Sequence, residues 1–307
     1  MIFTEKVTVA ALPPFRFDLS SEIFADGDKQ IRNYENGVFW QVIRVDSKLI
    51  LATVETLGTV DKLKVSAELK SDSAITQGDK KKAEKAVSAL FSLNLDLKPF
   101  YETVKDDRIM ADVTRKLWGL KNPTTPTVFE ALVDSIVEQQ ISLKVANNIE
   151  NNVVKRFGDI LDLKGEIYYA YPNPQRLASV SIEELRQCGL SFRKGEYIRE
   201  AARRITEGKL NLENLKNYEQ SEQIIKELDE IRGIGVWTAE LTMLRGMQRL
   251  EALPADDSGL RRDISHYYCD GKMITGAEAR RIAKGWGRWK GLAAYYLVVA
   301  SMLRIDV

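Results

Sequence analysis

The spacing of apolar side chains changes once along the chain, near residue 75. Before that point, apolar residues alternate with polar ones or form short β-branched runs, as in VFWQVIRV, KLILATVETL and KLKVSAEL. Turn signals such as ADGD and ENG separate these runs. Alternation with a period of two is typical of strands that bury one face. The pattern therefore predicts an antiparallel sheet at the start of the chain.

From residue 79 onward, apolar residues recur with the helical period. The segment DKKKAEKAVSALFSL predicts an amphipathic helix, and nearly everything after it is predicted to be helical, including FEALVDSIVEQQISLKVANNIENNVVKRFG, RKGEYIREAARRI and GLAAYYLVVASML. KNPTTPT is typical of a linker and YPNPQ of a second loop. We therefore expect an α+β protein, with a small β-rich N-terminal domain followed by a larger all-α region.

Composition narrows the class of protein. The chain has 307 residues, of which 44% are hydrophobic, and this is enough for about two domains. The sequence has no run of about 18 apolar residues and no basic, cleavable leader, so we expect no membrane span, no signal peptide and an intracellular location in the cytoplasm or nucleoid. With only Cys188, Cys269 and His266 as soft ligands, we expect no metal centre built by side chains.

Charge alone does not indicate a nucleic-acid partner. The chain carries 45 Lys and Arg against 44 Asp and Glu, which gives a net charge of +1. A basic patch is the usual electrostatic sign of DNA binding, and none is evident in this balance. A hairpin that contacts phosphates through backbone amides needs few lysines, however, so the motifs have to decide.

One motif combines two glycines with an abrupt change of helix. The stretch LDEIRGIGVWTAE places Gly233 and Gly235 between two predicted helices. A glycine at a helix C-terminus adopts a left-handed conformation cheaply and allows a tight reversal. A Gly-x-Gly turn at a helix N-terminus also leaves backbone N–H groups bare, so that a phosphate can approach them. The pattern fits both an ordinary αα-hairpin and one that grips a DNA backbone.

Two acidic residues follow the second helix of this hairpin. TAELTMLRGM is predicted to end near Gly246, and after the loop EALPADD a new helix begins at SGLRRDISHYY. Asp256 and Asp257 therefore lie at a helix N-terminus, where an aspartate is a preferred cap. Because two acids in a row exceed what a cap requires, one of them is available to face a cleft.

The order LDEIRGIGVWTAE, then LPADDSGLRR, resembles the helix-hairpin-helix DNA glycosylases, and within them the AlkA-type 3-methyladenine DNA glycosylase II group. VEQQISLKVANNI, YPNPQRLASVSIEELRQCGLSFRKGEYI and AKGWGRWKGLAAYYL extend the resemblance over roughly residues 120 to 300. It implies three units: a TBP-like β domain over 1–95, a helical subdomain of 96–127 with 250–307 that carries the catalytic Asp, and a second helical subdomain over 128–249 that carries the hairpin.

The resemblance also implies an activity. Such enzymes flip an alkylated base, such as 3-methyladenine or 7-methylguanine, out of duplex DNA and hydrolyse its N-glycosidic bond in base excision repair, with no cofactor. Their catalytic Asp directly precedes a pattern like x-G-L-R, which selects Asp257, whereas a simple Pro-x-Asp count would select Asp256. An ionised carboxylate there stabilises positive charge on the sugar and orients the attacking water. The expected partner is damaged double-stranded DNA, bound by a monomer.

Trp237 bears on the type of reaction. Bifunctional relatives carry a lysine nucleophile at this position, so the resemblance implies an enzyme without AP lyase activity. An indole is also a suitable wall for a cationic alkylated purine, although a core aromatic residue is the plainer alternative. Two other functions remain open: an oxidised-purine glycosylase, which Trp237 opposes, and a non-catalytic helix-hairpin-helix DNA-binding protein, which the presence of Asp257 opposes.

The same resemblance assigns residues to DNA contact and to the base pocket. Gln140, with Gln139 as the runner-up, would fill the hole left by the flipped base. Phe24 is a pocket candidate for which core packing is the alternative, and Arg304 could instead complement a helix dipole. The substrate-pocket set is Trp237, Phe24, Arg304 and Asp256. The DNA-binding set is Gln139, Gln140, Gly233, Ile234, Gly235 and Thr238, with a monovalent cation held by hairpin carbonyls.

Overall fold

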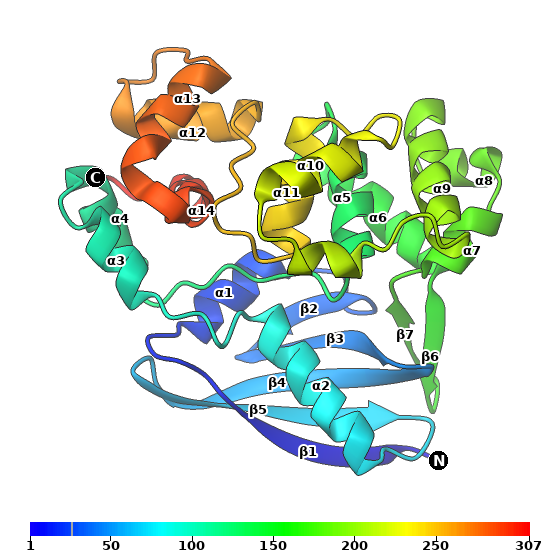
Figure 1. The fold of residues 1–307 in the computed structure, drawn as a ribbon. Coiled ribbons are helices and arrows are strands. Elements are labelled where there is room, and N and C mark those ends of the chain that lie inside the picture. The colour runs from blue at the N-terminus through cyan, green and yellow to red at the C-terminus, as the bar shows by residue number, and fades with distance from the viewer. Residues whose placement is uncertain (26) are drawn as a thin grey trace.

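A five-stranded antiparallel sheet forms the base of the molecule, and a helical half stands on it (Figure 1). A computed structural model of the chain describes residues 1–25 and 27–307. The strand order is β1-β5-β4-β3-β2. The strands are β1 (Phe3–Ala10), β2 (Arg32–Glu35), β3 (Val38–Val45), β4 (Lys48–Thr59) and β5 (Lys62–Ser71). The predicted α+β class and the predicted N-terminal sheet are confirmed.

Helices α1 (Phe17–Phe24) and α2 (Gln77–Leu90) belong to this β-rich part. α2 packs across one face of the sheet, where Ala83, Val87 and Leu90 join a core with Phe39 and Val54. Alternation along the sequence predicts the strands here, but it did not reveal α1. Its eight residues are too few for the helical period to stand out.

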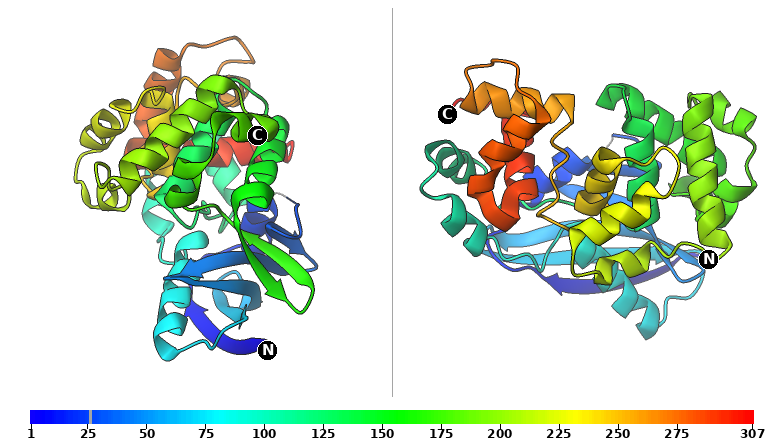
Figure 2. Two further views of the ribbon diagram at one scale, coloured as in Figure 1. Left: turned by 90° about the vertical axis from the view of Figure 1, so that its right-hand side faces the viewer. Right: turned by 45° about the horizontal axis from the view of Figure 1, so that its top comes forward.

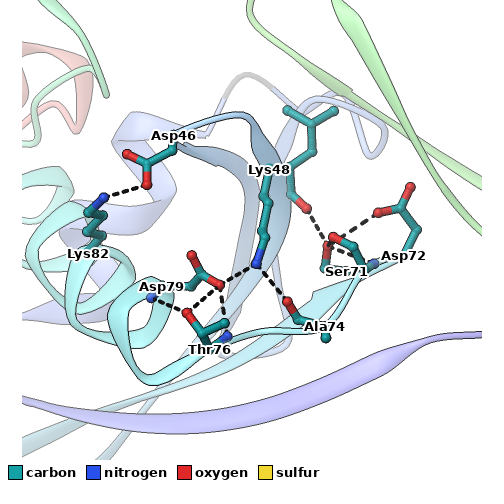
Figure 3. A network of polar contacts seen from close by, with 10 residues as sticks. Asp46, Lys48, Ser71, Asp72, Ala74, Thr76, Asp79 and Lys82 are labelled. Atoms are coloured by element: carbon teal, nitrogen blue, oxygen red, sulfur yellow. Dashed lines mark hydrogen bonds and ion pairs between the residues drawn. The ribbon is translucent and has the colours of Figure 1, made fainter.

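A polar network holds the start of α2 against the sheet (Figure 3). Thr76 forms a capping box with Asp79, which satisfies bare N–H groups at the helix start. The Nζ atom of Lys48 on β4 donates to Asp79 Oδ2 at 2.5 Å and to the carbonyl of Ala74 at 2.8 Å. The hydrogen bond from Lys48, helped by those from Thr76, lowers the pKa of Asp79 to about 2.

The helical half divides into two groups of helices, seen side by side in Figures 1 and 2. One group has a core drawn from residues 128–252, and the other has a core that joins Leu19 and residues 97–120 to residues 244–300. The first contains α5 (Val128–Glu138), α6 (Leu143–Phe157), α7 (Pro174–Ser179), α8 (Ile182–Gln187), α9 (Phe192–Thr206), η1 (Glu213–Asn217), α10 (Ser221–Asp229) and α11 (Val236–Gly246). The second contains α3 (Lys98–Val104), α4 (Arg108–Lys116), α12 (Ser258–Tyr268), α13 (Gly276–Ile282), η2 (Ala283–Trp289) and α14 (Lys290–Met302). No described helix is long and apolar enough to cross a membrane.

A two-stranded hairpin interrupts the helical half, where the sequence pattern predicted only helices and loops. Strands β6 (Asp159–Leu163) and β7 (Glu166–Ala170) are joined by a two-residue turn, and both turn residues have positive φ. The hairpin packs on the face of the sheet opposite α2, where Leu161 and Leu163 meet Val42 and Leu51. The hairpin therefore covers part of the sheet face opposite α2.

Candidate functional site: a glycine hairpin beside a capping aspartate

The two glycines of the α10–α11 hairpin have different structural roles. Gly233 has φ +88°, and a Cβ atom there would lie 2.2 Å from the ring of Tyr197. Only glycine fits this position without displacing the ring. Gly235 has φ −93°, and nothing lies within 4 Å of the place a Cβ would take. It is the N-cap of α11 and makes no side-chain cap, so the first N–H groups of α11 are left for an outside acceptor.

Gln139 braces the hairpin from the end of α5. Its Nε2 atom donates to the carbonyl of Gly233 at 2.9 Å and to Thr238 Oγ1 at 3.0 Å. The Nζ atom of Lys194 on α9 donates to the carbonyls of Gln139 at 2.6 Å and Val137 at 2.8 Å, and thus caps the C-terminus of α5. The α5–α6 turn and the hairpin are therefore fixed to each other by hydrogen bonds.

The remaining predicted DNA-contact residues divide between surface and core. Gln140 is exposed and has φ +58°, in the turn that follows α5. Thr238 and Ile234 are only 2% exposed, and the N–H of Ile234 donates to the carbonyl of Ile231 at 3.0 Å. Gln140 therefore has an accessible side chain, whereas Ile234 and Thr238 hold the hairpin in shape.

Asp257 and Trp237 meet at the start of their two helices. Asp257 is the N-cap of α12, and its Oδ1 atom accepts from the N–H of Leu260 at 2.7 Å. The other oxygen, Oδ2, accepts from the indole Nε1 of Trp237 at 3.2 Å. Trp237 is the second residue of α11, directly after the hairpin. The structure thus joins the glycine hairpin to one of the two candidate acids.

Asp256 points elsewhere. Its Oδ1 atom lies 2.2 Å from the position a Cβ would take on Gly276, the first residue of α13, so that glycine leaves room for this carboxylate. On the same helix, Arg280 forms a bidentate ion pair with Glu240 of α11, in which each N–O distance is 2.9 Å. This pair fixes α13 against α11.

Phe24 and Arg304 have surroundings of their own. Phe24 stacks on Phe39 with ring centroids 5.8 Å apart, and the guanidinium carbon of Arg32 lies 4.2 Å from its ring centroid. These are the contacts of a residue in the N-terminal core. Arg304 is exposed, has φ +54° and follows the end of α14 at Met302.

Sequence reasoning missed a cluster of charged and polar groups behind the hairpin. Arg245 of α11 forms an ion pair with Glu138, and the hydroxyl of Tyr171 donates to Asp134 Oδ1 at 2.7 Å. Burial raises the pKa of Asp134 to about 6 and that of Glu150 well above its usual value. Nothing in the sequence marks these residues, because charges on a helix ordinarily lie on a solvated face.

A separate cavity of about 640 Å³ lies among Asp96, Thr103, Gln248 and Trp289. Its lining includes neither Trp237 nor Asp257. Within the described residues, no group of three or more His, Cys, Asp or Glu could hold a metal ion.

Comparison with known proteins decides the family. The model for "HhH-GPD superfamily base excision DNA repair protein" matches residues 133–288. The chain is also 30% identical to a Bacillus subtilis protein named "DNA-3-methyladenine glycosylase", over 95% of this chain and 96% of that one. The chain belongs to the HhH-GPD superfamily. The part of this HhH-GPD protein that matches includes both glutamines, the hairpin and both candidate acids.

Solved structures extend the likeness to the whole HhH-GPD chain. A structure titled "3-methyladenine dna-glycosylase from Archaeoglobus fulgidus" matches with a TM-score of 0.84 and 25% identity, covering 99% of this chain and 100% of the other. A Clostridium acetobutylicum 8-oxoguanine glycosylase/lyase bound to double-stranded DNA matches with a TM-score of 0.77 and 22% identity, over 99% of each chain. The second likeness concerns the fold alone, and the first includes the N-terminal sheet.

Proposed function

We propose that this protein is a monofunctional DNA glycosylase that hydrolyses the N-glycosidic bond of alkylated purines in duplex DNA. The observation that carries the proposal is the hydrogen bond between Trp237 and Asp257, because it holds an indole ring and a carboxylate side by side next to the hairpin. The relative and the neighbour named 3-methyladenine glycosylases support alkylated bases as the substrate class.

The base would bind against the indole of Trp237. A purine methylated at a ring nitrogen carries positive charge, and an indole face attracts a cation by roughly 0.5–2 kcal/mol. The hydrogen bond from the indole N–H to Asp257 limits rotation of the ring. The attraction is greatest for a cationic base, and it therefore favours a damaged base over a neutral one.

Asp257 would stabilise the sugar as the bond breaks. Cleavage leaves positive charge on the deoxyribose, and a carboxylate held close to it lowers the barrier and orients the attacking water. The N–H of Leu260 and the indole N–H each hold one oxygen of this carboxylate. The group is therefore set in place before the substrate arrives, and little reorganisation is needed during the reaction.

The hairpin and the α5–α6 turn would hold the DNA. The open backbone at Gly235 and the first turn of α11 offer N–H groups to a phosphate. The exposed Gln140 would fill the gap left by the extracted base, while Gln139 fixes the turn to the hairpin. The carbonyls of Ile231 and Gly233 each accept one hydrogen bond and keep a second lone pair, which fits a monovalent cation that would neutralise phosphate charge.

An AP lyase step needs an amine nucleophile, and the hairpin lacks one. Trp237 stands where bifunctional relatives carry a lysine. The Nζ atom of Lys194 is engaged by two carbonyls behind the hairpin, and burial lowers its pKa. Water is therefore the nucleophile in this proposal, and the product is an intact strand with an abasic site.

The proposed division of labour follows three units. Residues 1–95 form the β domain, 128–249 carry the hairpin, and 96–127 with 250–307 carry the catalytic aspartate. The proposed groups for base cleavage and DNA contact all come from one chain, and the proposed working form is a monomer on damaged duplex DNA.

The test is incubation of the purified protein with methylated duplex DNA and, in parallel, with a duplex that contains 8-oxoguanine. We expect release of methylated purines, strand breaks only after added alkali, and no covalent adduct with borohydride. A strong borohydride adduct would favour the lyase alternative, and release of 8-oxoguanine alone would favour the oxidised-purine alternative. Binding of damaged duplex without release of any base would leave a non-catalytic DNA-binding protein.

A further inference from the structure

Helices α5 and α11 pack antiparallel in a fixed register behind the hairpin. The Nε2 atom of Gln139 donates to Thr238 Oγ1 at 3.0 Å. One turn further along, Thr242 Oγ1 donates to Ser135 Oγ at 3.4 Å. A further turn away, a Cβ on Gly246 would lie 2.7 Å from Ala131. These three contacts give the position of any α5 residue relative to α11.

The ion pair between Arg245 and Glu138 joins two residues that do not lie opposite each other in this register. The residue opposite Glu138 is Ala239, and the residue opposite Arg245 is Leu132, yet the two side chains meet. Helical side chains lean toward the N-terminus of their own helix, so in an antiparallel pair these two lean toward each other. The charged groups therefore meet near the level of Leu241, roughly 6 Å along α11 from Trp237.

Arg245 is the accessible member of the pair. Its side chain is 32% exposed, against 10% for Glu138. Apart from Val236 and Trp237 in the first turn, it is the one residue of α11 that is not buried. Trp237, Leu241 and Arg245 follow a spacing of four, which places them on one stripe of the helix. The guanidinium of Arg245 thus lies on the same stripe of α11 as the indole of Trp237, one helical turn further from the hairpin.

Tyr295 of α14 is a second polar residue in the region of Arg245. Its hydroxyl is buried and has no hydrogen-bond partner among the described residues. Tyr295 packs against the core that contains Leu244, the neighbour of Arg245 on α11, and a Cβ on Gly291, one turn earlier on α14, would lie 3.0 Å from Leu244. Burial raises the pKa of Tyr295, and the charge of Arg245 acts in the opposite direction. A buried hydroxyl without a partner costs free energy, and a polar atom of a bound molecule would recover it.

We propose that Arg245 and Tyr295 form the far end of the base pocket and select purines with an oxygen at position 6. This inference rests on the proposed function. With the sugar at Asp257 and the base against Trp237, the edge of a purine opposite the glycosidic bond reaches about one helical turn deeper. Arginine N–H groups pair readily with O6 of guanine.

The chemistry distinguishes two methylated bases. 7-Methylguanine presents O6, which accepts from the guanidinium, whereas 3-methyladenine presents an amino group there, which leaves donor facing donor. Both bases are cationic, and the ion pair with Glu138 offsets the charge of the guanidinium. The 6-oxo group therefore decides the preference, and hypoxanthine, which also has it, belongs with 7-methylguanine.

The experiment measures both bases released from one sample of randomly methylated duplex DNA. We expect Arg245→Met to lower the rate for 7-methylguanine, relative to that for 3-methyladenine, about tenfold or more, as for loss of one charged hydrogen bond. Tyr295→Phe should lower the same ratio about two- to tenfold, as for a neutral hydrogen bond. Arg203→Met is the matched control, because it breaks a surface ion pair with Glu200 and should leave the ratio unchanged.

The outcomes distinguish failure of the proposed function from failure of the pocket role of Arg245 and Tyr295. A wild-type enzyme that releases neither base contradicts the proposed function and this inference together. A wild-type enzyme that releases both, with a ratio that stays within twofold in folded Arg245→Met, contradicts the pocket role alone. If a thermal melt shows that Arg245→Met is unfolded, Tyr295→Phe decides, because it removes only a hydroxyl and leaves the packing of the ring intact.

Discussion

The two adjacent aspartates allow one chemical change to be tested at neighbouring positions. In Asp257→Asn the amide oxygen can still accept from the N–H of Leu260, so the N-cap survives. The amide N–H₂ then faces the indole N–H of Trp237, where an acceptor stood at 3.2 Å. That lost hydrogen bond costs about 1 kcal/mol of stability. The lost charge should cost much more in rate, about a hundredfold or above, equivalent to about 3 kcal/mol.

Two further variants separate these contributions. Asp256→Asn makes the same change on a carboxylate that lies against Gly276, and it should leave base release near the wild-type rate. Trp237→Phe removes the indole N–H and keeps the charge of Asp257, and it should slow release about tenfold, as for one charged hydrogen bond. The order of rates should therefore be wild type and Asp256→Asn, then Trp237→Phe, then Asp257→Asn.

The assay is single-turnover release of hypoxanthine from a defined duplex, with a thermal melt and binding to an abasic duplex as controls. Hypoxanthine is neutral and leaves less readily than cationic 7-methylguanine, so the defect of Asp257→Asn should be larger on hypoxanthine. Abasic binding should change little in all three variants. If Asp257→Asn stays near the wild-type rate while folded Asp256→Asn is inactive, the catalytic assignment moves to Asp256; if both are active, the loop is not catalytic.

Three other predictions follow from single contacts. Gly235→Ala should lower stability by at most about 1 kcal/mol through a poorer N-cap, but it should weaken binding to damaged and undamaged duplex alike. Gly233→Ala should lower stability by about 1–3 kcal/mol through backbone strain and overpacking, and thermal melts would measure both losses. Asp79 has a folded pKa of about 2, below the unfolded value of about 3.9, so its pairing with Lys48 stabilises the protein above about pH 4. The difference in Tm between wild type and Asp79→Asn should therefore shrink as the pH falls toward 2. A difference that stays constant over this range would contradict the reasoning. Lys121→Met should cost about 1–3 kcal/mol in denaturant unfolding, because the carbonyls of Leu12 and Leu93 lose the Nζ donor of a buried lysine.

Local patterns in the sequence were enough to predict the two-part architecture. The change from alternating to helical spacing places the sheet before the helices, and the Gly-Ile-Gly turn places the hairpin between α10 and α11. The N-terminus of α12 was also predicted, because a capping aspartate followed by a helical run is a local signal. These features depend on neighbours within a few residues, and so a single sequence contains them.

Features that depend on distant contacts were not predictable in this way. The orientation of Asp256 depends on Gly276, which lies on another helix. The brace from Gln139 to Gly233 joins residues 94 positions apart, and it gives the two glutamines different surroundings. The β6–β7 hairpin did have a local signal, because Lys164 and Gly165 form a two-residue turn with positive φ, and glycine favours such turns.

The β6–β7 hairpin limits how far the protein can be shortened. A helical fragment without the N-terminal sheet would still carry Leu161 and Leu163, whose apolar partners Val42 and Leu51 would be gone. Exposing a buried leucine to water loses roughly 1.5–3 kcal/mol of stabilising free energy, and the two leucines would form an exposed apolar patch that favours aggregation of the fragment. An engineer who wants a minimal version of this enzyme should therefore replace both leucines with polar residues, or delete the hairpin together with the sheet.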